Sequence, residues 1–217
     1  MNLKNLIIIV FFNITLIVST SNAADNYMKI NYGISNNNTG ITAAVESKGS
    51  MTSDEEDTGL MLSAGSMIGD FWGVDLAYYN LGSSSVKVDA GSMITSNKIS
   101  YVAESAGTIK NDISGFGLGL ILGNNNDLAE SFALDYYVKV GAHSWDKSGS
   151  TTILDNNDGF KSSFYNEGIG AYGGLGVSMG LFNGIVLDIA YDVIGISNNV
   201  SFDNNSSLLS GGLKFKF

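Results

Sequence analysis

The chain has 217 residues, a formal net charge of −10, and neither cysteine nor proline. This length suits one domain of moderate size, and the absence of cysteine excludes a disulfide framework or a cysteine-based zinc site. The negative charge argues against a polyanionic partner such as DNA, because proteins that bind nucleic acids carry basic patches. We therefore expect no nucleic-acid partner.

Residues 1–23 have the layout of a secretory signal peptide. Lys4 supplies a positive start, residues 6–18 form an apolar run, and Ser21 and Ala23 provide a small-residue cleavage site. An uncleaved anchor helix is the competing interpretation, but the apolar run is short for spanning a bilayer. Cleavage would leave residues 24–217 as one domain without a stretch apolar enough for a transmembrane helix, so this domain would have to cross a membrane with strands.

After this leader, apolar and polar residues alternate with a period of two in eight segments. In a strand, such alternation places the two sets of side chains on opposite faces. Most segments have about the length that a tilted strand needs to cross a bilayer. They cover residues 27–35, 58–68, 72–81, 113–123, 132–145, 168–181, 185–196 and 208–217.

The last segment shows the alternation most clearly. Its apolar face carries Leu209, Leu213, Phe215 and Phe217. Its other face carries Ser210, Gly212, Lys214 and Lys216. A soluble strand usually buries its apolar face under another layer, whereas a strand that closes a barrel can turn this face to lipid. The terminal Phe217 also resembles the C-terminal signal of bacterial outer-membrane proteins, which implies the barrel-assembly machinery as a partner.

The connections between the segments alternate in length. Those after the second, fourth and sixth segments are short, at residues 69–71, 124–131 and the Asn183-Gly184 pair, which is a strong hairpin signal. The other connections are mostly longer and polar. Short turns on one side and long loops on the other are typical of outer-membrane barrels. Aromatic residues at or beside the short turns predict an interfacial belt on the periplasmic side: Phe71, Trp72, Phe132, Phe182 and Phe217.

Charged residues of both signs occupy inward positions of these segments. They are Asp75, Asp135, Asp188, Asp192, Lys29, Lys139, Lys214 and Lys216. The interior of an eight-stranded barrel is just wide enough to be filled by side chains, and isolated buried charges are costly. We therefore expect these charges to pair, with the surplus negative charge in loops such as the one holding residues 54–57.

Together these features predict an all-β protein, an antiparallel eight-stranded up-and-down transmembrane β-barrel in a Gram-negative outer membrane, with its long loops outside. Residues 72–78 (Trp-Gly-Val-Asp-Leu-Ala-Tyr), residues 134–145 and the closing strand resemble the OmpA-like eight-stranded barrels. In that family a lumenal acid on the third strand pairs with a lumenal arginine on the fifth. The resemblance therefore implies a pair between Asp75 and Lys139. Because the chain ends at the barrel, we do not expect the peptidoglycan-binding domain of many relatives.

Three other patterns suggest binding or chemistry. Residues 168–173 match a dinucleotide-binding glycine motif, but a period-two strand follows where the motif needs a helix. Inward positions of this strand carry Gly168, Gly170, Gly174, Gly176 and Gly180, and we expect glycines there to make room in the lumen for large neighbours such as Tyr172 and Lys139. The acidic residues 54–57 and 155–158 could hold a divalent cation, but solvated loop charge is the simpler interpretation. We expect no cofactor and no resident metal.

His143, the single histidine, is the third pattern. Outer-membrane enzymes that act on acyl chains use a histidine with a serine, but Ser144 would point to the opposite face of the strand. A serine from a loop stays open as a partner. A lumenal, hydrogen-bonded histidine near the outer mouth is the interpretation we prefer.

We therefore predict a non-enzymatic scaffold that shows its loops at the cell surface as an adhesin or surface antigen. Its partners would be outer-membrane lipid, lipopolysaccharide and a ligand on a host or another cell. The first alternative is a small channel gated by the lumenal charges around Asp75 and Lys139. The second is a lipid-modifying enzyme built on His143.

Overall fold

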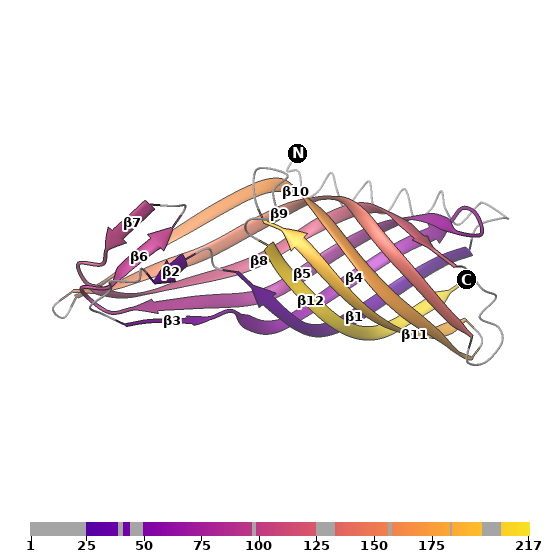
Figure 1. Cartoon of the computed structure of the whole chain (residues 1–217), viewed down its shortest axis with the longest axis horizontal. Helices are drawn as coiled ribbons and strands as arrows, with labels where there is room; N and C mark the ends of the chain where they lie inside the picture. The colour runs from indigo at the N-terminus through magenta and orange to yellow at the C-terminus, as the bar shows by residue number, and fades with distance from the viewer. Residues whose placement is uncertain are drawn as a thin grey trace.

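The computed structural model describes residues 25–38, 41–43, 50–96, 99–124, 133–155, 158–182, 184–196 and 205–217. These residues form twelve strands (Figure 1). The strands are β1 (Asp25–Asn37), β2 (Ile41–Ala43), β3 (Met51–Asp54), β4 (Glu56–Met67), β5 (Trp72–Val88), β6 (Met93–Ser96), β7 (Ile99–Val102), β8 (Ala106–Gly123), β9 (Leu134–Asp155), β10 (Asp158–Phe182), β11 (Ile185–Gly195) and β12 (Asn205–Lys216). Within the described ranges, no helix is long and apolar enough to cross a membrane.

Eight of these strands close into an antiparallel barrel. Their order is β5-β4-β1-β12-β11-β10-β9-β8, and β8 pairs with β5 to complete the circle. The first and last strands meet along a continuous register that runs from Tyr27 opposite Lys216 to Asn37 opposite Ser206. Closure leaves no sheet edge inside the barrel wall, so the backbone groups there pair with one another. The predicted fold class is confirmed.

The alternation of side chains decides which face of each strand is outside. On β9, Leu134, Tyr136 and Val138 are exposed, whereas Asp135 and Lys139 are buried. The same division recurs around the barrel, so the outside is apolar and the inside is polar, aromatic and charged. This is the reverse of a soluble barrel with a dry core, and it is the arrangement expected where lipid is the outer solvent.

Four strands run further than the sequence predicted. We expected strands to end or begin at residues 81, 113, 145 and 168, but β5 ends at Val88, β8 begins at Ala106, and β9 and β10 form one hairpin that continues to Asp155 and Asp158. Large exposed aliphatic side chains stop at Val140 on β9 and Ile169 on β10. The prediction was wrong because the additional residues are rich in Ser, Thr, Gly and Asn, which leave no apolar alternation to read.

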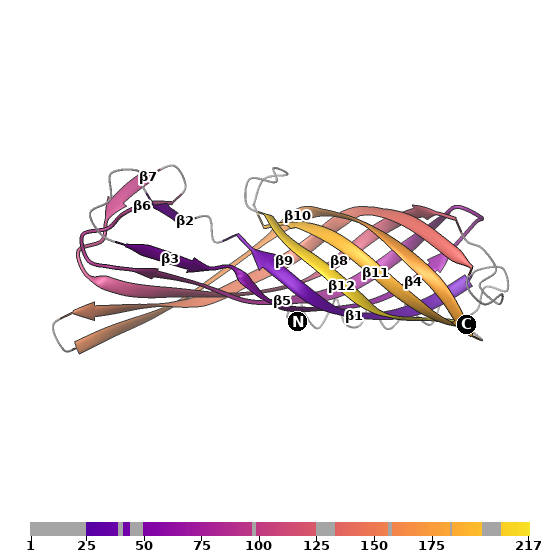
Figure 2. The same cartoon turned by 60° about the horizontal axis from the view of Figure 1, so that its bottom comes forward.

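These longer strands form what we call the outer extension: β3, residues 82–88 of β5, 106–112 of β8, 146–155 of β9 and 158–167 of β10. It projects from one end of the barrel, opposite the C-terminus (Figures 1 and 2). Within the described chain, the outer half of β10 pairs only with β9, so one of its edges is open. A separate sheet of β2, β6 and β7 joins the first and second long connections, because Ile41–Ala43 pairs with β6. The first connection therefore adds a strand to a shared sheet.

Two apolar clusters lie inside the barrel, at different heights. One, which includes Tyr79 and Trp145, lies toward the outer extension. The other contains Tyr27, Met67, Ile121 and Tyr137 and lies toward the short turns, an end that we call the turn end. Along β9, Lys139 falls between Tyr137 of one cluster and Trp145 of the other. The lumen is therefore layered, with buried charges between two apolar groups.

Candidate functional site: a filled and charged lumen

The shortest ion pair of the lumen joins Lys139 on β9 to Asp192 on β11. Its Nζ–Oδ1 distance is 2.7 Å, and both side chains are completely buried. The two residues are not on adjacent strands: Lys139 lies opposite Gly174 of β10, and Gly174 lies opposite Asp192. Because glycine has no side chain, the two charged groups meet across the middle strand. A Cβ atom on Gly174 would overlap Asp192 Oδ1 and lie 3.0 Å from Lys139 Cε.

The expected pair between Asp75 and Lys139 is wrong. Asp75 instead accepts a hydrogen bond of 2.8 Å from the Tyr27 hydroxyl, and its other carboxylate oxygen has no hydrogen-bond partner among the described residues. The reason is steric. The side chain of Tyr172 occupies the space above Gly119 and Gly141, the positions that follow Asp75 across β8 and β9.

Asp188 on β11 organises a second group. Its carboxylate accepts hydrogen bonds of 2.8 Å from Asn31 and from Ser178, and the Tyr137 hydroxyl lies 3.1 Å from both of its oxygens. Lys29 Nζ lies 3.4 Å from Asp188 and donates a 2.8 Å hydrogen bond to the Tyr137 hydroxyl. Side chains of β1, β9 and β10 thus contact one buried carboxylate on β11. A charge buried away from water needs several such polar partners.

The remaining predicted charges lie at the turn end. Lys216 Nζ is 3.6 Å from Asp135. Lys214 Nζ lies above the Tyr27 ring, 4.7 Å from its centroid, and forms no ion pair with any residue that the structure describes. The expectation that every lumenal charge pairs therefore fails at Lys214 and at Asp75.

His143 is buried and held on both ring nitrogens. Its Nδ1 shares a hydrogen bond with the Tyr79 hydroxyl, and its Nε2 lies 3.0 Å from the carbonyl oxygen of Gly195. The Tyr172 ring packs edge-on against it, 6.0 Å between centroids. With both nitrogens engaged, the imidazole has no free position for activating a serine in this arrangement.

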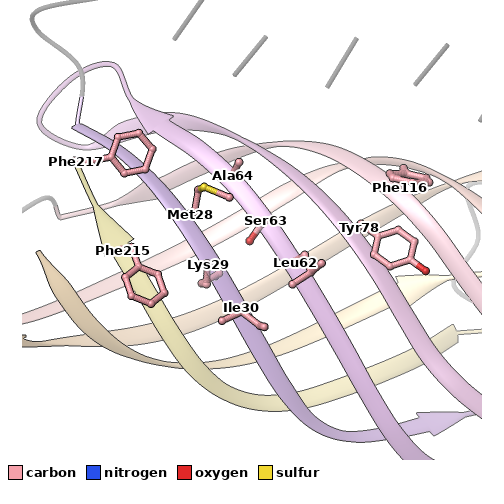
Figure 3. Close-up of a pocket in the computed structure, with 10 residues that line it drawn as sticks. All are labelled: Met28, Lys29, Ile30, Leu62, Ser63, Ala64, Tyr78, Phe116, Phe215 and Phe217. Atoms are coloured by element: carbon pink, nitrogen blue, oxygen red, sulfur yellow. The ribbon is translucent and has the colours of Figure 1, made fainter. Parts of the chain in front are cut away.

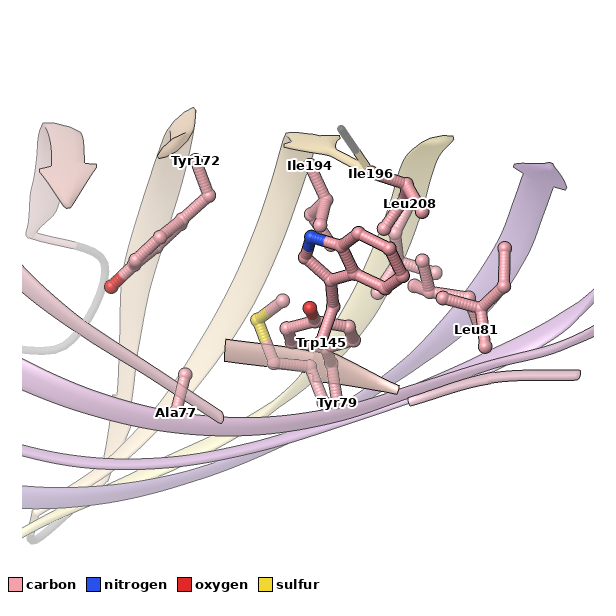
Figure 4. Packing of buried hydrophobic residues seen from close by; sticks show 10 residues of the cluster. Ala77, Tyr79, Leu81, Trp145, Tyr172, Ile194, Ile196 and Leu208 are labelled. Carbon is pink, nitrogen blue, oxygen red and sulfur yellow. The ribbon is translucent and has the colours of Figure 1, made fainter. Parts of the chain in front are cut away.

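The outer apolar cluster lies between the charged layer and the outer extension. Figure 4 shows Trp145 and Tyr79 beside Leu81, Ile194 and Leu208. These side chains are almost fully buried and come from strands all around the barrel. An ion entering from the outer end would have to pass a dry constriction, which is a barrier to conduction.

Inward glycines make room for large side chains, as predicted at Gly174 beside Lys139, but the room for Tyr172 comes from glycines of β8 and β9. Added Cβ atoms at Gly117, Gly119 and Gly141 would meet the Tyr172 ring, and one at Gly176 would meet Tyr137. Gly170 would meet His143 in the same way. The segment that matched the dinucleotide motif is continuous strand in β10.

Sequence reasoning missed the tyrosines that complete the polar groups. Tyr27 bonds Asp75, Tyr137 links Lys29 to Asp188, and Tyr79 holds His143. Each lies at inward parity on its strand; Tyr27 and Tyr137 have charged neighbours of the same parity, Lys29 and Lys139, whereas Tyr79 lies between Ala77 and Leu81. That parity is the signal that could have identified them.

Asp57, in the predicted acidic run, closes an irregular point between β4 and β5. Its carboxylate accepts hydrogen bonds from the backbone N–H of Ser83, at 2.6 Å, and of Thr58, at 2.7 Å. On the other side of β5, the pairing with β8 shifts register between Asn80 and Ser83, and Gly82 has a φ of 71°. These N–H donors, Ser83 first, hold the pKa of Asp57 below its ordinary value.

Among the described residues, no cluster of His, Asp and Glu has a geometry that could hold a metal ion.

No protein-family model and no curated protein sequence matches the chain. Solved structures do. The outer membrane protein OprG from Pseudomonas aeruginosa superposes with a TM-score of 0.52 at 17% identity, over 90% of this chain and 96% of that one. The chain has the fold of an outer-membrane barrel. Ail of Yersinia pestis, solved with the heparin analogue sucrose octasulfate, superposes with a TM-score of 0.46 at 13% identity, over 89% of this chain and 99% of that one. Neisserial surface protein A superposes with a TM-score of 0.41 at 16% identity, over 89% of this chain and 99% of that one.

The outer face of this barrel is apolar over the half that ends at the short turns. Four of the predicted belt aromatics, Phe71, Trp72, Phe182 and Phe217, are exposed and lie at the turn end. The fifth, Phe132, lies outside the described residues, as do the predicted signal peptide and the side chains of residues 155–158. An apolar groove crosses β12, β1, β4 and β5, where Ala64 lies opposite Met28 and Leu62 opposite Ile30 (Figure 3). This surface suits lipid chains, and the belt itself stays a prediction.

Proposed function

We propose that this protein is an outer-membrane barrel of the OmpA-like kind that acts as a surface scaffold. In this proposal the outer extension faces the outside of the cell and makes contact with other cells or molecules, and the barrel anchors it in lipid. Assembly would proceed through the C-terminal strand that ends at Phe217, in a membrane whose outer leaflet holds lipopolysaccharide.

The observation that carries the proposal is the length of the β9–β10 hairpin. Its strands have 22 and 25 residues, about twice what a tilted strand needs to cross a bilayer. The large exposed aliphatic side chains stop at Val140 and Ile169, while the paired strands continue. Residues that are not needed to cross the membrane, yet are kept in an ordered sheet, support a role in presenting a surface.

The chemistry of the outer extension indicates the kind of partner. By sequence, the outer extension holds six acidic residues and four lysines, and Asp54, Asp112, Asp146 and Glu167 belong to its described surface. A partner surface with basic residues would complement it. The open edge of β10 adds backbone donors and acceptors that could join such a contact.

The lumen supports this role over a channel. The charged layer is packed, its largest groups are bonded to one another, and the apolar cluster around Trp145 lies between it and the outer extension. The enzyme alternative has weaker support still, because both nitrogens of His143 are bonded to Tyr79 and Gly195.

The test compares attachment to cultured epithelial monolayers by a non-adherent Gram-negative strain that expresses the protein. In the key variant an Asn-Gly turn joins Lys147 to Asn166, which are paired in the hairpin, so that residues 148–165 are removed. Leu175→Ala, a lipid-facing change lower on β10, is the control. We expect the wild type and the control to attach and the shortened variant to lose attachment.

Two readouts keep the outcomes separate. A heat-dependent gel mobility shift of each variant reports that the barrel is folded. Conductance in planar bilayers tests the channel. Equal attachment by the shortened variant, or steady conductance by the wild type that Asp75→Ala changes, would contradict the scaffold proposal.

A further inference from the structure

A small pocket opens at the turn end of the lumen. Its polar lining comes from Lys29, Lys214, Asp135 and Tyr137, and Met67 and Ile121 lie on its apolar side. Its volume is about 20 Å³. Because a single water needs roughly 10–15 Å³, the pocket holds one occupant of about the size of a water molecule.

Two lysines stand directly opposite each other at this pocket. Lys29 of β1 and Lys214 of β12 are cross-strand partners, and both point inward. Like charges in such positions repel each other. Lys29 has Asp188 at 3.4 Å and the Tyr137 hydroxyl at 2.8 Å to offset its charge. Lys214 has the face of the Tyr27 ring, at 4.7 Å, and forms no ion pair with a carboxylate in the described part of the chain, although Asp135 lines the same pocket.

The ammonium group of Lys214 is therefore a buried cation without a direct ion pair among the described residues. Only 9% of the residue is exposed, although its side chain lines the pocket. Around it, the lysines 29, 214 and 216 face two aspartates, Asp135 and Asp188, which leaves one positive charge in excess. The opposite excess lies deeper, where one buried lysine, Lys139, accompanies two buried aspartates, Asp75 and Asp192.

We propose that this pocket binds one halide-sized anion, such as chloride, against Lys214. The anion offsets the surplus positive charge and separates the two opposed ammonium groups. The size of the pocket sets the ligand class, because a whole phosphate ion does not fit where one water-sized occupant does. This site is independent of the proposed surface role, since it lies at the other end of the barrel.

The test is chloride-35 NMR on the whole protein, folded in a zwitterionic detergent. We expect the protein to broaden the chloride signal, bromide to reverse this at millimolar concentrations, and phosphate to leave it unchanged. Lys214→Gln should remove at least most of the bromide-sensitive broadening. Lys87→Gln, on an exposed lysine of the outer extension, should keep it.

The gel mobility shift shows whether each variant is folded, and crystals of the wild type soaked in bromide give a second measurement that needs no variant. An anomalous peak beside Lys214 Nζ is expected. No saturable broadening, equal broadening by Lys214→Gln, or a bromide-soaked pocket without a peak would overturn the site. Displacement by phosphate as effective as by bromide would overturn its assignment to halide-sized anions.

Discussion

Lys139 and Asp192 form an ion pair across an intervening strand, with Gly174 of β10 between them. The pair is completely buried, so its strength depends on a geometry that permits a direct contact. A glycine at the middle position provides that geometry, because any side chain there would occupy the space of the carboxylate.

Gly174→Ala should therefore destabilise the barrel. The new methyl group would displace the Asp192 carboxylate, and overpacking of this kind costs about 1–3 kcal/mol. The matched control is Gly173→Ala, whose added Cβ points outward and meets nothing closer than 3.4 Å. Urea unfolding in lipid vesicles, followed by tryptophan fluorescence, measures both. Equal losses of unfolding free energy in the two variants would contradict the role of Gly174 between Lys139 and Asp192.

The partner of Lys139 can be tested by a double-mutant cycle. Lys139→Met and Asp192→Leu should each cost about 3–5 kcal/mol, because each leaves one buried charge unpaired, and the double variant should lose much less than their sum. The parallel cycle of Lys139→Met with Asp75→Asn should show little coupling, since these residues form no ion pair. A coupling energy to Asp75 as large as that to Asp192 would restore the pair that the resemblance implied.

Tyr27→Phe should cost about 1–3 kcal/mol of the free energy of unfolding. The Tyr27 hydroxyl is the sole hydrogen-bond donor to Asp75 in the described structure, and its loss leaves a buried carboxylate without one. Tyr32→Phe, on the same strand but facing outward, is the control and should change stability by less than about 0.5 kcal/mol. If both variants unfold at the same urea concentration, the bond to Asp75 contributes nothing.

Asp57 predicts a pH-dependent change at the start of the outer extension. The native pKa of Asp57 lies below its ordinary value of about 3.9, so its carboxylate stabilises the fold above that value. This contribution disappears as the pH falls through the native pKa. The amide proton of Ser83, which bonds the carboxylate, should report the titration by NMR with a midpoint below 3.9. Asp57→Asn should abolish the transition, and a wild-type midpoint at or above the ordinary value would contradict this role.

The barrel could be predicted from the sequence because lipid imposes a strict rule. Each spanning strand must alternate, as β1 does with Met28 and Ile30 against Lys29 and Asn31, and the structure places these sets on opposite faces. Residues outside the lipid need no such alternation. The Ser- and Thr-rich ends of β9 and β10 therefore carry no pattern from which their pairing could be predicted.

The pairing of charged side chains inside the lumen could not be predicted from the sequence for a different reason. Parity predicts that Lys139 and Asp192 point inward, but their contact depends on register across three strands and on the space left by Gly174. The position of Tyr172, which separates β9 from Asp75, depends on glycines of two other strands. Such contacts are set by packing that no single segment encodes.

We propose that the barrel wall near the turn end is embedded in lipid while the outer extension stands outside the cell. Because the chain has no native cysteine, single-cysteine variants can test it directly in intact cells with a membrane-impermeant maleimide. Ser163→Cys, on the exposed outer half of β10, should be labelled without breaking the cells, and Leu175→Cys, on the apolar wall of the same strand, should stay unlabelled until the protein is unfolded. Labelling of position 175 in intact cells, or of position 163 only after the outer membrane is opened, would contradict the account.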